Sequence, residues 1–228
     1  MIKITNIITP SYEQWMAAIK GMRNPMNSWD KIDSKENTCN NISCDNCSEI
    51  CSQIELGKND YDLMKRLTLA GTEHSKFLRM LPVMMDITAP LYWWKEFDTY
   101  KVGTVANSCS TMHKIADKEF TLDDFSVENL YEDVIDSPFR EIIDCLNFFR
   151  GLYIQNNDKD DWWQMIQLLP SSYNQKRTVF LNYAVLANMY HQRKGHKLDE
   201  WHDFCDMIEK LPYSEFITKN FVQNENLS

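Results

Sequence analysis

The sequence lacks a run of apolar residues long enough to cross a membrane. Its most apolar stretch, residues 78–90, is interrupted by Arg79 and Asp86, whereas a transmembrane helix needs about 20 predominantly apolar residues in succession. The N-terminus, MIKITNIITP, also lacks the basic start and long apolar core of a signal peptide. We therefore expect a cytoplasmic protein with no membrane partner.

Basic residues are in short supply. The 24 Lys and Arg residues face 33 Asp and Glu residues, which gives a net charge of −9. Non-specific binding to nucleic acid needs a basic surface, so we expect no nucleic-acid partner. A local anion pocket is still compatible with this charge, because it takes only a few residues. The 228 residues, 43% of them hydrophobic and 12% aromatic, suffice for a folded core and exclude disorder.

The cysteines do not suit a secreted, fully disulfide-paired framework, because there are seven of them. Four crowd into ENTCNNISCDNCSEIC with the spacing C-x4-C-x2-C-x3-C. The flanks are polar and bury little, so a tetrathiolate metal site would order this loop, with zinc first and an iron–sulfur cluster second. An insertion with incidental thiols is the alternative. The candidate ligands are Cys39, Cys44, Cys47 and Cys51; Cys109, Cys145 and Cys205 are expected to be ordinary buried thiols.

Hydrophobic periodicity predicts an α/β (α+β) fold, mainly helical with a small central sheet. We expect one domain over residues 1–228, with a Cys-rich insertion at about residues 36–55. The predicted strands cover residues 2–9 and 77–88. Helices are predicted over residues 11–22, 59–70, 90–98, 162–169, 174–192 and 199–211, and a further helix is predicted to start at Ser137 and Pro138 and reach residue 152.

The predicted helix over residues 174–192 combines a core face with a polar face. Its apolar stripe is formed by Val179, Tyr183, Leu186 and Tyr190. Asn182 and Arg193 are eleven residues apart, close to three helical turns, and so are Arg177 and Asn188. The cations Lys176, Arg177 and Arg193 can hold phosphates or a carboxylate. The amides Asn182 and Asn188 can pair with the edge of a heterocycle. A solvated helix face is the alternative.

The stretch LYWWKEFDTYKVGTVANSCSTMHK places aromatic residues beside many small hydrogen-bonding groups. The aromatic residues could stack on a flat ring, or they could be core; they are Trp93, Trp94, Phe97 and Tyr100. Gly103 allows the backbone to approach a ligand closely. Around it lie hydroxyl and amide groups, namely Thr99, Thr104, Asn107, Ser108, Ser110 and Thr111. This concentration predicts a ligand site.

Two segments resemble the flavin-dependent thymidylate synthases. ITAPLYWWKEFDTYKVGTVANSCSTMHK is similar to that family's signature region, in which Ala-Pro precedes an aromatic-rich helix and then R-H-R-x-x-S-x-N-E-x-S-x-R. LPSSYNQKRTVFLNYAVLANMYHQR resembles its C-terminal segment in the positions of Leu169-Pro170, Asn182, Leu186, Asn188 and Arg193. The resemblance covers most of the chain outside residues 24–57 and about 115–135, and the Cys-rich loop has no counterpart in it.

The signature itself is altered. The family's Arg-His-Arg falls on Thr99, Tyr100 and Lys101, its next Ser on Thr104 and its final Arg on Thr111. Of the three signature positions, only Lys101 keeps a positive charge. Lys176, with Arg177 adjacent, occupies the position of another phosphate-binding Arg of the family, where Lys supplies charge without the bidentate fork.

The resemblance implies a homotetramer that binds FAD and methylates a deoxyuridine monophosphate-type nucleotide, with folate and NADPH as co-substrates. Arg193 matches the pyrimidine-binding Arg and is the catalytic candidate. The implied cofactor-binding residues are Thr99, Tyr100, Lys101, Asn107, Asn182 and Asn188. The implied substrate-binding residues are Glu96, Cys109, Ser110, Thr111, Lys176, Arg177 and Arg193.

Two other functions stay open at this stage. The loss of the signature arginines is compatible with a nucleotide-binding or regulatory protein that keeps the fold without catalysis. The Cys-rich loop is compatible with a metal-dependent interaction module.

Overall fold

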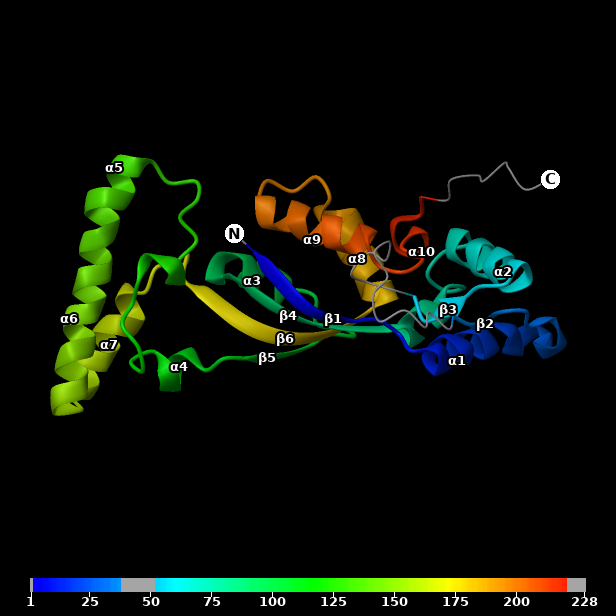
Figure 1. Ribbon diagram of the computed structural model, residues 1–228, viewed down its shortest axis with the longest axis horizontal. Coiled ribbons are helices and arrows are strands. Elements are labelled where there is room, and N and C mark those ends of the chain that lie inside the picture. Colours follow the sequence, from blue (N-terminus) through cyan, green and yellow to red (C-terminus); the bar gives the residue numbers. More distant parts are fainter. Residues whose placement is uncertain (1, 38–51, 221–228) are drawn as a thin grey trace. The chain divides into compact units, whose positions relative to one another are not determined.

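The computed structural model describes residues 2–37 and 52–220. These residues divide into two compact units (Figure 1). Unit 1 comprises residues 2–4, 86–99 and 106–178, and unit 2 comprises residues 5–37, 52–85, 100–105 and 179–220. The prediction of one domain over residues 1–228 stays a prediction, because compact units are not in themselves independent domains.

The strands form one four-stranded sheet and one short pair. The sheet has the order β1-β4-β6-β5, with the bounds Lys3–Ile8, Pro82–Pro90, Asn174–Asn182 and Val105–Ser108 in that order. Strands β2 (Lys35–Glu36) and β3 (Ile54–Glu55) pair antiparallel. The predicted mixture of helices with a small sheet is confirmed. The predicted strand over residues 77–88 begins later than expected, after the 3-10 turn η3 (Lys76–Met80).

Unit 2 is built mainly from helices. They are α1 (Tyr12–Arg23), α2 (Lys58–Leu69), α8 (Tyr183–Arg193), α9 (Asp199–Glu209) and α10 (Glu215–Thr218), with short 3-10 turns η1 (Asn24–Met26) and η2 (Trp29–Lys31). Helix α1 starts as predicted, because Ser11 and Gln14 form a capping box. Helix α2 begins after Gly57 rather than at Asn59 or Asp60.

The core of unit 2 centres on the fully buried Trp15 of α1. Its ring meets those of Tyr183 and Tyr213 edge-on, with centroid distances of 5.6 and 5.5 Å. The Tyr183 hydroxyl donates to the carbonyl of Pro212 at 2.6 Å, so this buried phenol has a partner. Helix α8 is thereby tied to both α1 and the segment before α10.

A buried carboxylate joins α1, α2 and the segment between them. Asp60 is fully buried and pairs with Arg23, whose Nε and Nη2 atoms lie 2.7 and 2.6 Å from Oδ1. Its Oδ2 accepts from the backbone N–H groups of Asp33 and Ser34 and from the Ser34 hydroxyl. Burial by itself would raise the pKa of Asp60, but hydrogen bonds from Ser34, Arg23 and the backbone outweigh it and hold the pKa below its usual value.

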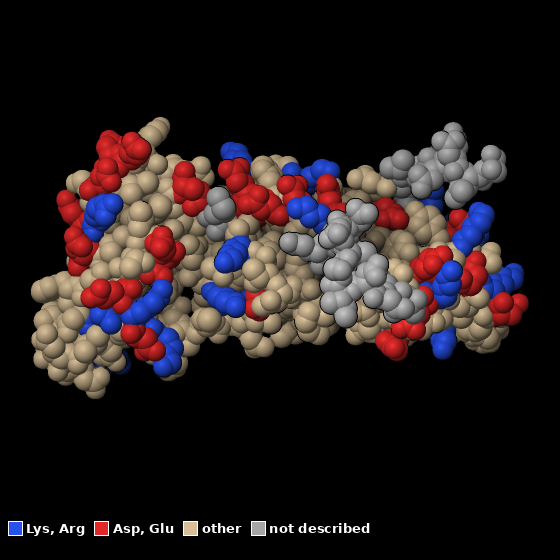
Figure 2. All heavy atoms as spheres, viewed as in Figure 1, with Lys and Arg blue, Asp and Glu red and all other residues tan. Residues whose placement is uncertain are grey.

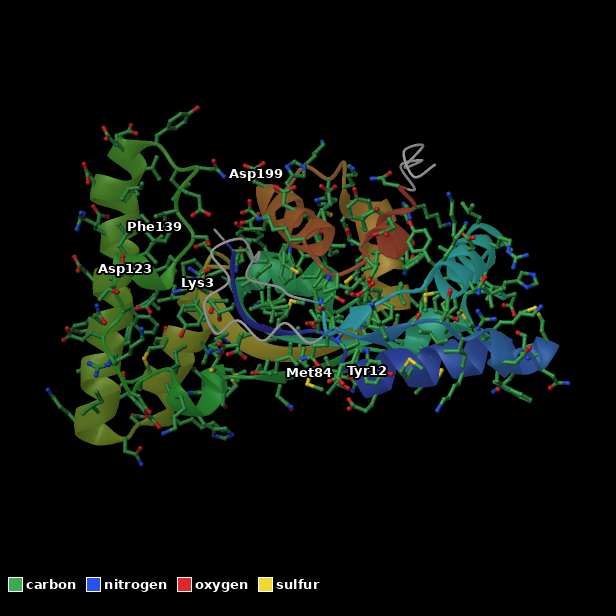
Figure 3. The ribbon with its side chains drawn as sticks, turned by 45° about the vertical axis from the view of Figure 1, so that its right-hand side comes forward. Lys3, Tyr12, Met84, Asp123, Phe139 and Asp199 are labelled. Carbon is green, nitrogen blue, oxygen red and sulfur yellow. The ribbon has the colours of Figure 1, made fainter. Side chains whose placement is uncertain are left out.

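Unit 1 has its own core beneath a helical hairpin. Its helices are α3 (Leu91–Phe97), α4 (Thr111–Lys114), η4 (Leu122–Asp124), α5 (Glu132–Val134), η5 (Ile135–Phe139), α6 (Arg140–Asn156) and α7 (Lys159–Leu168). Phe139, labelled in Figure 3, belongs to a buried cluster with Ile115, Phe120, Phe125, Ile143, Leu146 and Met165. Figure 2 shows acidic side chains over α5 and η5, where Glu132, Asp133 and Asp136 are exposed.

The predicted helix start at Ser137 and Pro138 is wrong. Helix α5 already begins at Glu132, and Pro138 lies inside the continuous helical segment that leads into α6. Proline removes an N–H donor and clashes with the carbonyl four residues back. The turn at Ile135–Phe139 is a π-helix, whose wider hydrogen-bond pattern accommodates the ring.

The predicted helix over residues 174–192 is also wrong. Residues Asn174–Asn182 form strand β6, and only Tyr183–Arg193 form a helix. The segment TVFL is rich in β-branched and aromatic residues, which favour a strand. Lys176 and Arg177 therefore do not share a helix face with Asn188, and the eleven-residue relation between Arg177 and Asn188 has no structural meaning.

Two further expectations bear on the fold. Within residues 2–37 and 52–220, no helix combines the length and the apolar character that crossing a membrane requires. The predicted metal ligands Cys39, Cys44, Cys47 and Cys51 lie outside the described residues. Among the residues that are described, no three His, Cys, Asp or Glu side chains gather where they could hold a metal ion.

We expect Asp60→Asn to lower the free energy of unfolding by about 3–5 kcal/mol at pH 7, because it leaves the buried Arg23 without its counter-charge. The folded-state pKa of Asp60 is lowered, so its stabilisation is present above the unfolded pKa of about 3.9 and is lost as the pH falls towards the folded pKa. Urea unfolding between pH 7 and pH 3 should show the two proteins converging.

The control is Asp62→Asn, which removes the exposed partner of Lys58 at 3.0 Å. It should cost no more than about 1 kcal/mol. A difference between wild type and Asp60→Asn that stays constant down to pH 3 would contradict the role assigned to the Asp60 carboxylate.

Candidate functional site

The residues singled out from the sequence fall into both units. Unit 2 contains Tyr100, Lys101, Asn182, Asn188 and Arg193. Unit 1 contains Glu96, Thr99, Asn107, Cys109, Ser110, Thr111, Lys176 and Arg177.

In unit 2, Asn182 marks the change from strand to helix. Its backbone is extended (φ −141°, ψ 167°), and its Oδ1 accepts from the N–H of Val185 at 3.0 Å as the N-cap of α8. Gly103 lies directly against this cap. It has φ +77°, and a Cβ at this position would lie 3.0 Å from Asn182 Nδ2 and 3.0 Å from Val185 Cγ2. The loop therefore needs glycine both for its backbone angle and for its close approach.

Helix α8 borders a pocket of about 470 Å³ along most of its length, and this volume is within the range of small-molecule sites. Its floor is one face of α8, where Ala184, Asn188 and His191 recur at helical spacing. The other walls come from the end of α2, the turn that follows it, the loop at Gly103 and the end of α10. They comprise Thr68, Gly71, Thr72, Ser75, Leu78, Arg79, Val102, Phe216 and Lys219, together with Asn182, Val185 and Ala187 of the α8 region.

The aromatic residues expected to form a stacking wall are core. Trp93, Trp94, Phe97 and Tyr100 are each no more than 8% exposed, so in the described structure they offer no open face to a ring. The spacing of aromatic residues along the sequence does not distinguish a ring packed in the core from an exposed ring.

Tyr100 instead makes a polar contact that the sequence did not indicate. Its hydroxyl donates to Gln192 Oε1 at 2.9 Å and accepts from Arg193 Nε at 2.8 Å. Gln192 Nε2 in turn donates to Asn188 Oδ1 at 2.8 Å. A hydrogen-bonded chain thus runs from the pocket-lining Asn188 to Arg193.

Arg193 is also held by aromatic rings. Its guanidinium carbon lies 4.8 Å from the ring centroid of Trp201 and 5.5 Å from that of Tyr100. Cation–π contacts of this kind restrict a long side chain. The orientation of the catalytic candidate is therefore fixed by α9 and by the signature segment of the same unit.

In unit 1, Arg177 is the centre of a compact network. Its Nη1 donates to Asp98 Oδ1 at 2.7 Å, its Nε donates to Gln175 Oε1 at 2.9 Å, and its guanidinium carbon lies 4.2 Å from the Trp94 ring centroid. Gln175 Nε2 donates to the carbonyl of Cys109 and to the Thr111 hydroxyl. Three predicted substrate-binding residues are therefore connected through Gln175.

Lys176 is likewise paired with an acid. Its Nζ lies 2.9 Å from Asp86 Oδ2, and Asp86 Oδ1 accepts from the Thr178 hydroxyl at 2.6 Å. Both cations expected to hold a phosphate, Lys176 and Arg177, thus face carboxylates of their own unit.

The remaining candidates are mostly exposed. Thr99, Lys101, Asn107, Cys109 and Ser110 are open to solvent, whereas Glu96 and Thr111 are half-buried. Ser110 caps α4 by accepting from the N–H of His113, and the Thr99 hydroxyl donates to the carbonyl of Glu96.

Of the three distant cysteines, only one is a buried thiol as expected. Cys205 is buried, and burial raises its pKa to about 11. Cys145 is half-buried and Cys109 is exposed, so the expectation is wrong for both. How far each cysteine is exposed depends on tertiary packing, which the apolar pattern of its segment does not specify.

Sequence reasoning missed most of the pocket. Thr68, Thr72, Ser75, Arg79, His191 and Lys219 line it, and none was a candidate. The only signal in the sequence is the cluster of hydroxyl residues around Gly71, just after the helix predicted over residues 59–70. Gly71 does follow α2 and has φ +106°.

Comparison with solved structures identifies the fold. Two crystal structures of the flavin-dependent thymidylate synthase ThyX from Helicobacter pylori, both complexed with FAD and dUMP, align with this chain at a TM-score of 0.61 and 18% sequence identity. Each alignment covers 93% of this chain and 96% of the other. No family model and no curated protein matches the sequence significantly. The chain therefore has a ThyX-like fold, as the sequence resemblance predicted.

We expect Tyr100→Phe to lower the free energy of unfolding by about 1 kcal/mol, because it keeps the ring and removes one hydroxyl that both donates and accepts. Arg193 should also lose its orientation, which NMR of the arginine Nε–H groups would detect as faster hydrogen exchange. The matched control is Tyr131→Phe, at a side chain that is 81% exposed. Equal effects of the two variants would count against the Tyr100–Arg193 contact.

We expect Gly103→Ala to destabilise the protein by about 1 kcal/mol or more, since alanine disfavours the positive φ and would crowd Asn182. Gly151→Ala should stabilise by up to about 1 kcal/mol, because Gly151 is inside α6 with no atom near its missing Cβ. Thermal unfolding of both variants measures the contrast. Stabilisation by Gly103→Ala would contradict the close approach.

Proposed function

We propose that this protein is a flavin-dependent, thymidylate synthase-like methyltransferase that acts on a deoxyuridine monophosphate-type nucleotide. One observation carries the proposal beyond the fold. Asn182 and Asn188, the two amides that the sequence resemblance assigned to flavin, line one pocket together with Gly103, the residue expected to allow close approach to a ligand.

The pocket suits a flavin ring in size and chemistry. Its volume of about 470 Å³ accommodates a planar tricyclic ring with part of its side chain. Small residues, including Ala184 and Ala187, keep the α8 face open, and amide groups can pair with the donors and acceptors at the edge of such a ring. When bound, a reduced flavin would supply the electrons for the reaction.

The roles of the chain's own residues follow from their chemistry. Arg193 would donate N–H bonds to a pyrimidine carbonyl and stabilise the negative charge that develops as C5 becomes nucleophilic. Tyr100 and Trp201 hold its guanidinium in place for that purpose, and preorganised donors of this kind need little rearrangement during reaction. The folate and NADPH co-substrates and the homotetramer belong to the same proposal.

The other candidate residues keep the roles given by the resemblance, as proposals. Lys176 and Arg177 would bind the 5′-phosphate. To do so, Lys176 would give up its ion pair with Asp86, and Arg177 its ion pair with Asp98. The remaining proposed substrate contacts are Glu96, Cys109, Ser110 and Thr111. The remaining proposed cofactor contacts are Thr99, Tyr100, Lys101 and Asn107.

A second function is favoured by the paired cations of unit 1. Because Lys176 and Arg177 each face a carboxylate, a phosphate must compete with Asp86 and Asp98 for them. This competition weakens phosphate binding at the proposed substrate site, which suits a protein that has lost catalysis on the same fold and keeps a nucleotide-binding or regulatory role.

The test starts with the absorption spectrum of the purified protein between 300 and 500 nm and with titration of added FAD. We expect flavin to bind, and we expect release of tritium from 5-tritiated dUMP when folate and reductant are supplied. Asn188→Ala should weaken flavin binding about tenfold, the loss of one well-placed hydrogen bond. Its control is Asn156→Ala, an exposed asparagine of α6.

The outcomes separate the two functions. Flavin binding with tritium release supports the methyltransferase. Nucleotide binding without tritium release supports the second function. A protein that binds no flavin at any concentration tested contradicts the methyltransferase proposal.

A further inference from the structure

The charge of the unit 2 pocket is opposite to that of the chain. The whole protein carries a net charge of −9, yet no aspartate or glutamate is among the residues that line this pocket. Its ionisable side chains are Arg79 from η3, His191 from α8 and Lys219 from the end of α10. The pocket therefore favours an anionic ligand.

Arg79 and Lys219 also differ from many other cations of this unit. Arg23, Lys35, Lys58, Lys76 and Lys194 each have an acidic partner within 4 Å. Within the described part of the chain, neither Arg79 nor Lys219 has one. Their charge thus remains available to an incoming anion.

His191 and Lys219 lie close enough to repel each other. The pKa of His191 is lowered, first by burial and next by the positive charge of Lys219. Lys219 itself has φ +58°, a left-handed backbone conformation that is strained for a lysine. An anion between these groups would relieve the repulsion.

A buried hydroxyl gives an independent indication of a ligand. Thr68, in the last turn of α2, lines the pocket and is 2% exposed. Its Oγ1 has no hydrogen-bond partner among the described residues. Buried polar atoms are nearly always paired, because an unpaired one costs about 1–3 kcal/mol. A bound molecule with a polar atom at this position would supply the missing bond.

The layout of α8 indicates the length of that molecule. Asn182 precedes the first turn and His191 lies nine residues later, which corresponds to about 13 Å along a helix at about 1.5 Å per residue. Between them the pocket face is formed by Ala184, Ala187 and Asn188. A ligand that reaches both ends needs a ring for the amide end and an extended anionic group for the cationic end.

We propose that Arg79, His191 and Lys219, the three ionisable side chains that line the unit 2 pocket, bind the diphosphate of a dinucleotide cofactor there. The assignment of the cofactor as FAD rests on the proposed function, but the diphosphate site does not. These residues lie outside the Thr99–Lys101 segment, where two of the three positions that carry Arg-His-Arg in the resembling family are uncharged. The charge that binds the cofactor's phosphates would thus come from a different part of the fold.

The test compares ligands that carry a diphosphate with ligands that lack it. Calorimetry at low salt would measure ADP against adenosine, and FAD against riboflavin, on wild type, Lys219→Gln, Arg79→Gln and Lys219→Arg. We expect wild type to bind ADP at least tenfold more tightly than adenosine. Each Gln variant should lose about tenfold in ADP affinity with adenosine unchanged, and Lys219→Arg should retain most of it. Lys210→Gln, an exposed lysine outside the pocket, is the matched control, and circular dichroism would confirm folding.

The outcomes separate this inference from the proposed function. The diphosphate site is overturned if wild type binds ADP no more tightly than adenosine, even if riboflavin binds. It is also overturned if neither Gln variant changes the affinity for ADP. ADP binding that depends on Lys219 and Arg79 supports the site even if riboflavin and FAD fail to bind, in which case the proposed function fails alone. An equal loss of ADP affinity in Lys210→Gln would also overturn it, because it would reveal only a general charge effect.

Discussion

The change from strand to helix at Asn182 determines the arrangement of the whole pocket. The side chain of Asn182 caps α8 through the Val185 N–H, and Gly103 packs against that cap so closely that a Cβ would lie only 3.0 Å from Asn182 Nδ2. Helix α8 then continues with Asn188 and His191 on the pocket face and with Arg193 at its end. If the register of α8 shifted by one residue, the side chains of Asn188 and His191 would rotate together by about 100° and would no longer face the pocket.

The protein uses its cations in two distinct ways. In unit 1, Arg177 and Lys176 face Asp98 and Asp86, and Arg177 also lies on the Trp94 ring. In unit 2, Arg79 and Lys219 line a pocket that contains no acidic side chain. A paired cation stabilises its own fold, whereas an unpaired cation at a pocket attracts a ligand. Sequence similarity directs attention to the first pair, and the structure directs it to the second.

Arg193 is held in place by a residue of the segment that resembles the family's signature region. Tyr100 replaces the histidine of the resembling family, and its hydroxyl connects Arg193 to Gln192 and, through Gln192, to Asn188. With Trp201 on one face of the guanidinium, the side chain is held from two directions. Tyr100 thus also orients Arg193, the catalytic candidate.

The sequence by itself determined the local structure wherever short-range chemistry decides it. The Ser11 capping box of α1, the α3 helix after Pro90 and the glycine at position 103 follow from side-chain capping and backbone sterics, and the two-segment motif was sufficient for the fold. Only the tertiary structure decided between strand and helix at residues 174–182. The four-residue spacing from Val179 to Tyr183 fits both the two-residue period of a strand and the 3.6-residue period of a helix. It also decided the burial of Trp93 and Trp94. The gathering of Thr68, Arg79, His191 and Lys219 depends on the tertiary structure too, because these four residues lie in different elements and meet only through packing.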